Sequence, residues 1–181
     1  MNRFAAAAAV LWILPALAQH AGHHPQGGQG HSPYAGQQSR GIKALSEQEV
    51  KDLLGGAGMG FAKAAELNRY PGPMHALELA DPLGLSAAQR EQLAAIMKAH
   101  KERARSLGAV VVERERELDA LFASGTADAA GVDGISAAIG EAVARLRAEH
   151  LKTHLQAAAL LTPAQIERYV SARGYATGAA R

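Results

Sequence analysis

The sequence has no cysteine among its 181 residues, and only 4% of its residues are aromatic. Without cysteine the chain forms no disulfide and offers no thiolate, so any metal ligand must be a histidine, a carboxylate or a methionine. It also lacks the alternating runs of β-branched residues that predict strands, whereas alanine is abundant. This composition predicts an all-α protein.

An excess of charge of either sign is also missing. The chain has 19 Lys and Arg residues against 17 Asp and Glu residues, a formal net charge of +2. Because basic and acidic residues are nearly equal in number, the composition argues against a nucleic acid or a membrane surface as the partner. The one long apolar run, residues 4–17, is too short for a comfortable transmembrane span, so we expect no stable membrane insertion.

Residues 1–18 are typical of a signal peptide. Arg3 provides the basic start, residues 4–17 form the apolar centre, and Ala16-Leu17-Ala18 has the small-x-small form of a cleavage site. We therefore expect cleavage after Ala18 and a soluble periplasmic protein. Residues 19–41 are rich in Gly, Gln, His and Pro, which predicts a disordered leader. Its histidines are interpreted either as loose metal scavengers or as part of a solvated linker; they are His20, His23, His24 and His31.

Residues 42–181 are predicted to form a single helical domain. A capping box at Ser46–Glu49 begins a short helix, which the GGAGMG stretch at 55–60 interrupts as a flexible hinge. A second short helix is expected over residues 61–69, and a third begins at Pro73 and ends near Asp81. Whether residues 42–73 pack on the rest of the domain or are only loosely attached is left open.

Two long helices follow. A capping box at Ser86–Gln89 begins the first, which runs for about 37 residues until Ser124-Gly125, and the second is predicted over residues 132–160. Thr162 and Gln165 cap a final helix. Both long helices have an apolar stripe at steps of three and four, and the loop between them is short, which predicts a long antiparallel hairpin with short flanking helices.

The position of the turn sets an approximate register. With the turn near residue 127, Gln89 meets Gln165 at the open end of the hairpin. His100 then falls beside His154, and His150 lies about one turn away. Three histidines are therefore predicted to converge at one level of an apolar seam.

The capping boxes also indicate a family. The stretches LGLSAAQREQL (83–93) and LLTPAQIERY (160–169) resemble the paired LTxxQ motifs of the Spy/CpxP superfamily, over roughly residues 74–169. That superfamily groups small periplasmic helical chaperones and stress-sensing accessories with heavy-metal-resistance sensors. The resemblance implies a protein that is not an enzyme, has no catalytic residue and forms a homodimer through the hairpin.

The metal-sensing branch of that superfamily places histidines just before each motif. Here His75 precedes the first motif, and His150 and His154 precede the second. A second histidine is expected four residues after His75, where this chain has Leu79, and Glu78 is the nearest substitute. The candidate metal ligands are therefore His150, His154, His100, His75 and Glu78. The expected ion is divalent Zn, Ni, Co or Cu, and no organic cofactor is expected.

Other interpretations remain open at this stage. The histidines are also compatible with a purely structural role, as partly buried neutral side chains that bond to one another, to carbonyls or to water. The protein would then be an ATP-independent holdase for unfolded periplasmic clients, or an adaptor that restrains a membrane stress sensor. Met59, Met74 and Met97 are read either as soft copper(I) ligands or as packing residues.

Overall fold

A computed structural model describes residues 32–175 of the chain. The predicted signal peptide and the leader histidines lie outside the described residues. The described part contains a 3-10 turn, η1 (Gln37–Ser39), followed by helices and no strand, which confirms the all-α prediction. None of its helices is long and apolar enough to cross a membrane.

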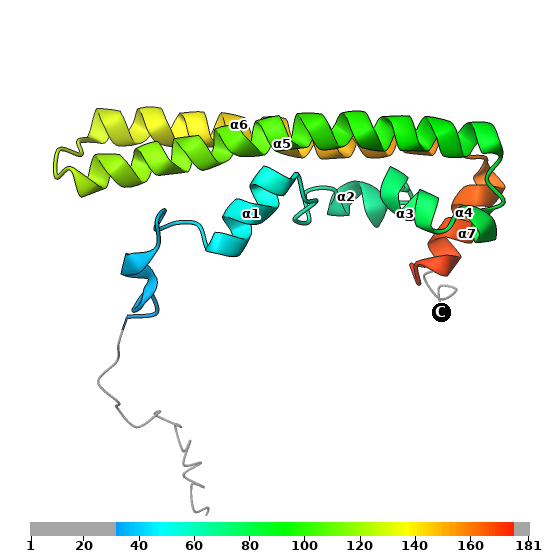
Figure 1. The fold of residues 1–181 in the computed structure, drawn as a ribbon, viewed down its shortest axis with the longest axis horizontal. Coiled ribbons are helices and arrows are strands. Elements are labelled where there is room, and N and C mark those ends of the chain that lie inside the picture. Colours follow the sequence, from blue (N-terminus) through cyan, green and yellow to red (C-terminus); the bar gives the residue numbers. More distant parts are fainter. Residues whose placement is uncertain (1–31, 176–181) are drawn as a thin grey trace, which may run out of the picture. The chain divides into compact units, whose positions relative to one another are not determined.

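The two longest helices form the predicted antiparallel hairpin (Figure 1). Helix α5 (Ala87–Ala123) has 37 residues and begins at Ser86, whose hydroxyl accepts from Gln89 N as a capping box requires. Helix α6 (Ala129–Ala159) begins three residues before the predicted start, because Asp128 accepts from the Gly131 backbone N–H at 2.8 Å and caps it there. The connecting loop is correspondingly shorter than the sequence suggested.

Shorter helices surround the hairpin. Helix α1 (Glu47–Gly55) has the predicted capping box at Ser46. The second predicted helix is reduced to α2 (Lys63–Glu66), and the third is divided at Leu79 into α3 (Pro73–Glu78) and α4 (Ala80–Leu83). The last helix, α7 (Pro163–Ala172), begins after its cap at Thr162. In Figure 1, α1, α2 and α3 follow one another along the hairpin, and α4 and α7 lie at its open end.

Residues 42–73 are packed on the hairpin, which answers the question that the sequence left open. Ile42 and Leu53 are buried in one apolar cluster with residues of α5 and α6. Helix α1 comes so close to α5 that a Cβ on Gly108 would lie 2.1 Å from the Leu53 carbonyl oxygen. Gly108 is therefore the point at which the α1 backbone approaches the hairpin.

A pair of glutamines closes the open end, as the sequence register predicted. Gln89 Nε2 donates to Gln165 Oε1 at 2.9 Å, and Gln165 Nε2 donates back to Gln89 Oε1 at 3.0 Å. Each Nε2 also donates to a backbone carbonyl, of Leu160 or Gly84, and each Oε1 also accepts from the N–H of its own cap residue. All four hydrogen-bonding positions of each amide are thus used.

The buried apolar residues form two separate clusters. One lies at the open end, around α4 and α7, and consists of Ala76, Ala80, Leu83, Leu85, Leu93, Ala157, Leu161 and Tyr169. The other joins α1 to the middle of the hairpin and consists of Ile42, Leu53, Ala104, Val111, Val112, Ala142 and Leu146. Between these clusters the hairpin seam is polar, since its buried residues there are His100, His150 and Thr153.

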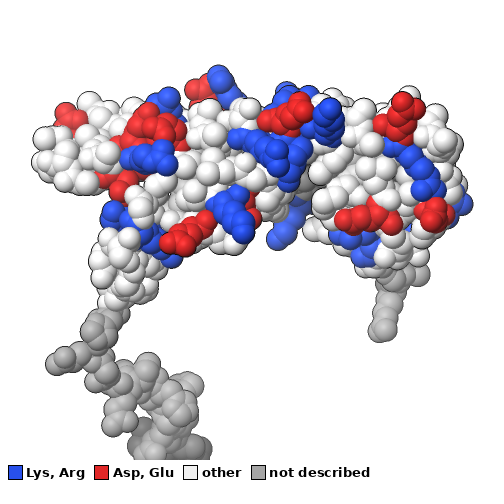
Figure 2. Space-filling model, viewed as in Figure 1, with Lys and Arg blue, Asp and Glu red and all other residues white. Residues whose placement is uncertain are grey.

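The surface has no large region of a single charge sign on the face shown in Figure 2, where basic and acidic side chains alternate along the hairpin. Several of these charges are paired within one helix, as Arg145 is with Glu141. The tip of the hairpin is nearly uncharged, because residues 120–140 include only two charged side chains, Asp128 and Asp133.

The stability of the fold is expected to be sensitive to a change of charge in the glutamine pair. Gln165→Glu keeps the shape but replaces the donating NH₂ group with an oxygen, which faces the Gly84 carbonyl and Gln89 Oε1. The free energy of unfolding is expected to fall by about 2–4 kcal/mol, measured by urea denaturation. Gln92→Glu is the control, because Gln92 is exposed on α5. Equal effects of the two substitutions would contradict the role given to the pair.

Substitution by alanine is expected to have opposite effects on stability at two glycines of the hairpin, Gly108 and Gly140. Gly108→Ala should lower the free energy of unfolding by about 1–3 kcal/mol, because the new methyl group overlaps the Leu53 backbone. Gly140→Ala on α6 meets no atom within 4 Å, so it should raise the same quantity by roughly 0.5–1 kcal/mol through helix propensity alone. Urea denaturation measures both. If Gly108→Ala is also stabilising, α1 does not dock as described.

Candidate metal centre

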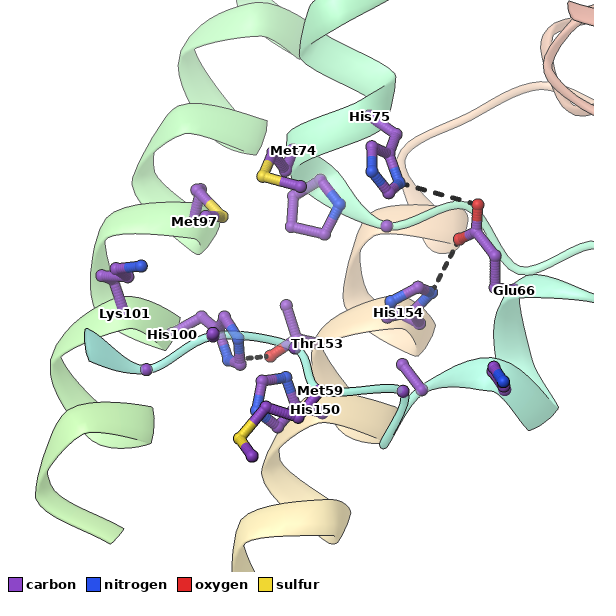
Figure 3. Close-up of a pocket in the computed structure, with 18 of the residues that line it drawn as sticks. Met59, Glu66, Met74, His75, Met97, His100, Lys101, His150, Thr153 and His154 are labelled. Carbon is purple, nitrogen blue, oxygen red and sulfur yellow. Dashed lines mark hydrogen bonds and ion pairs between the residues drawn. The ribbon is translucent and has the colours of Figure 1, made fainter. Parts of the chain in front are cut away.

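One pocket, of about 500 Å³, gathers the chemically distinctive side chains of the domain (Figure 3). All four histidines and all three methionines in residues 32–175 line it. They come from the GGAGMG loop, α3, α5 and α6, and are Met59, Met74, His75, Met97, His100, His150 and His154. The polar level of the hairpin seam, between the two apolar clusters, forms one wall of this pocket.

His100 is held in a defined tautomer. Its Nδ1 lies 3.2 Å from Glu149 Oε1 and 3.0 Å from Thr153 Oγ1, and the Thr153 hydroxyl donates to the Glu149 backbone carbonyl. Since an ionised carboxylate only accepts, Nδ1 carries the proton. The lone pair of His100 is therefore on Nε2, which is the arrangement that a carboxylate imposes on metal-binding histidines.

Glu149 is kept ionised for this role. Burial alone would raise its pKa, but hydrogen bonds from Arg103 and His100 outweigh burial and hold the pKa below its usual range. Arg103 Nε donates to Glu149 Oε1 at 2.8 Å. The same carboxylate thus orients His100 and is neutralised by Arg103.

His150 is the most buried of the four histidines, with 4% of its surface exposed. Its ring packs against Phe61 at 5.6 Å and edge-on against His100 at 4.6 Å between ring centroids. Burial, together with the neighbouring His100 and His154, lowers its pKa from 6.5 to about 4. Its Nε2 is buried and has no hydrogen-bond partner in the structure. A neutral imidazole with an unsatisfied nitrogen is a potential metal ligand.

The partners of His100 across the seam are shifted, by no more than about one turn, from the approximate register that placed it beside His154. His100 contacts His150 and Thr153 instead, because the α6 stripe that faces α5 moves from His150 to Thr153 at 3.6 residues per turn. His154 is rotated towards the segment after α2, where its Nδ1–H donates to the Tyr70 carbonyl at 2.7 Å. A Cβ on Gly72 would lie 2.8 Å from this ring, so glycine is needed there.

A second group of polar residues centres on Glu66. Its carboxylate oxygens lie 3.7 Å from His75 Nδ1 and 3.6 Å from His154 Nδ1. The hydroxyl of buried Tyr169 donates to Glu66 at 2.5 Å, and Arg173 Nε lies 3.5 Å away. Burial and the bond to Glu66 raise the pKa of Tyr169 far above its usual range. Glu66 therefore connects the pocket histidines to α7.

The pocket thus holds four of the five predicted ligands but in two groups, His100 with His150 and His75 with His154. The fifth, Glu78, is exposed and does not line the pocket, and Glu66 is the carboxylate that does. Within residues 32–175, no three His, Asp or Glu side chains are placed to hold one metal ion together. Sequence reasoning missed Glu66 because it lies on a four-residue helix, outside the two motifs.

The burial of His150 predicts how the metal-free protein responds to pH. Unfolded chains bind a proton at His150 near pH 6.5, whereas the folded protein does so only near pH 4. The unfolded state therefore binds more protons as the pH falls, and the free energy of unfolding should drop by about 2 kcal/mol between pH 7.5 and pH 5. Urea denaturation in the presence of a chelator measures this. His150→Gln should lose most of the drop, and an equal drop in this variant would contradict the assignment.

Comparison with known proteins agrees with this architecture. A family model described as heavy-metal resistance matches residues 52–168, from within α1 to within α7. No curated protein and no solved structure gives a match. The match includes both LTxxQ-like motifs, the whole hairpin and all seven histidines and methionines of the pocket. It covers more than half of the chain and confirms the resemblance seen in the sequence. The chain therefore belongs to the heavy-metal resistance family of Spy/CpxP-like helical proteins.

Proposed function

We propose that this protein is a periplasmic heavy-metal-resistance accessory, without enzymatic activity, that binds a transition-metal ion in the histidine pocket. The observation that carries the proposal is the gathering of every described histidine in one pocket. The chain is placed in the periplasm because residues 1–18 are typical of a signal peptide. Divalent Zn, Ni, Co or Cu are the ions that imidazoles bind most commonly.

The donor atoms of the pocket suit a metal. His100 and His154 each use Nδ1–H in a hydrogen bond to an oxygen, which leaves the lone pair of each ring on Nε2. His150 is neutral at physiological pH, and its Nε2 has no partner. Because the two histidine groups are separate, binding requires side chains of the pocket to rotate towards the ion. Such an ion would satisfy the buried nitrogen that the protein leaves unpaired.

A purely structural role explains these histidines less well. Most buried polar side-chain atoms in proteins have at least one hydrogen-bond partner. His150 interrupts the apolar seam between two clusters and leaves one ring nitrogen without a partner. An aliphatic residue at this position would pack without that cost.

The holdase remains the second candidate, and a groove next to the pocket favours it. The groove is lined by apolar and basic side chains with one acidic residue, namely Leu77, Ala94, Met97, Lys98, Lys101, Glu102 and Arg105. Such a surface suits an unfolded segment that is apolar and carries negative charge. A homodimer through the hairpin and restraint of a membrane stress sensor are further proposals from the family resemblance.

The metal proposal predicts a change in melting temperature. Titration of the full chain with Zn, Ni or Cu to about a hundredfold excess over Kd should raise Tm by roughly 10 °C. His150→Ala should abolish most of this rise, because it removes the most buried nitrogen ligand. His24→Ala is the matched control, since a leader histidine that binds metal equally in the folded and unfolded states leaves Tm unchanged.

The same two variants separate the candidates. If no ion raises Tm, or if His150→Ala responds as the unsubstituted chain does, the pocket is not a metal centre. Suppression of aggregation of a denatured client by the metal-free protein, unchanged in His150→Ala, would then favour the holdase.

A further inference from the structure

The three methionines of the pocket are not explained by packing. Met59 and Met74 are 41% and 46% exposed, so neither fills the core. Met97 lies on α5, one turn before His100, and also faces the pocket. Methionines usually occupy irregular gaps in apolar interiors, yet here every described methionine lines the one pocket that also holds every described histidine. Their common position indicates a role for the sulfur atoms.

Met59 is also held in an unfavourable backbone conformation. Its φ is +44°, in the left-handed region that favours glycine, and its neighbours in the GGAGMG loop are glycines and an alanine. A side chain there costs about 1–2 kcal/mol relative to glycine. The loop, which the sequence predicts to be a hinge, lines the pocket and places the Met59 side chain next to His150 (Figure 3).

The charges around the pocket disfavour a divalent ion. Lys63, Lys101 and Arg173 line it, whereas Glu66 is its only carboxylate. One oxygen of Glu66, Oε1, already accepts from the Tyr169 hydroxyl, which leaves only Oε2 without a hydrogen bond. At the histidine pair itself, Lys101 contributes to the lowered pKa of His150 against a larger opposite contribution from Glu149, so the excess of positive charge lies among the side chains that line the pocket. Because Coulomb repulsion grows in proportion to the charge of the ion, a monovalent cation experiences half of it.

We propose that the pocket selects a soft monovalent ion, Cu(I) or Ag(I), which binds to the thioethers of Met59, Met74 and Met97 together with neutral imidazole. Thioether sulfur is a soft ligand that prefers such ions over Zn(II) or Ni(II). Uncharged sulfur and imidazole ligands also require no additional carboxylate. The inference rests on the proposed function, since it specifies which ion the same pocket binds.

The test uses Ag(I) as a redox-stable probe and Zn(II) as the comparison. The full chain is used with His20→Gln, His23→Gln, His24→Gln and His31→Gln, so that the leader histidines do not bind either ion. With ¹³C-labelled methionine methyl groups, Ag(I) should shift the NMR signals of Met59, Met74 and Met97, whereas Zn(II) should not. Competition titrations should give an affinity for Ag(I) at least about tenfold higher than for Zn(II).

Variants separate the sulfur atoms from the fold. Replacing Met59, Met74 and Met97 with Leu preserves side-chain volume, and it should reduce the Ag(I) affinity about tenfold or more while leaving Tm without metal and the Zn(II) affinity unchanged. Leu67→Met is the control, because Leu67 is exposed and outside the pocket, and a thioether there should not raise the affinity.

Each other outcome is decisive. If Zn(II) binds through His150 while Ag(I) binds no more tightly and the methyl signals do not move, the selection of a soft ion is wrong and the proposed function stands. An unchanged Ag(I) affinity in the triple Leu variant likewise overturns the inference. If neither ion binds, both proposals fail.

Discussion

The reciprocal hydrogen bonds between Gln89 and Gln165 determine how the rest of the molecule is arranged. Each glutamine belongs to a capping box, so one side chain begins its own helix and also joins it to the other. Because all donors and acceptors of both amides are used, the pair fixes where α7 leaves the open end of the hairpin. That position places Tyr169 of α7, and Arg173 directly after this helix, next to Glu66 at the edge of the pocket.

The apolar core of the hairpin is not continuous, because buried polar residues interrupt it. Two apolar clusters stabilise it from the open end and from the middle, and His100, His150 and Thr153 occupy the buried seam between them. Burial keeps the imidazoles neutral, and Glu149 fixes the tautomer of His100. A buried unpaired nitrogen lowers stability. The proposed metal binding would account for retaining it in a member of the heavy-metal resistance family.

The segment before the hairpin contributes the other half of the pocket. Close approach of α1 at Gly108 anchors this segment, and from there the glycine-rich loop brings Met59 towards His150 and α2 brings Glu66 towards His154. None of these residues has a periodic pattern that relates it to the hairpin. Their positions depend on close approaches to the backbone, of the Leu53 carbonyl to Gly108 and of the His154 ring to Gly72, which explains why glycine occupies positions 72 and 108.

The sequence by itself determined the helical class, the 37-residue first helix of the hairpin, the three capping boxes and the meeting of Gln89 with Gln165. These features follow from local hydrogen bonds and apolar periodicity, which are encoded within short stretches of sequence. The histidines that the sequence singled out as candidate ligands, His75, His100, His150 and His154, all line the pocket. Only the tertiary structure decided that His100 meets His150 and not His154, because a rotation of one residue around α6 lies within the uncertainty of a register estimated from the turn. That Glu66 and not Glu78 lines the pocket, together with three methionines, likewise depends on how α1–α3 pack against the hairpin. The spacing of residues in the sequence does not predict this packing.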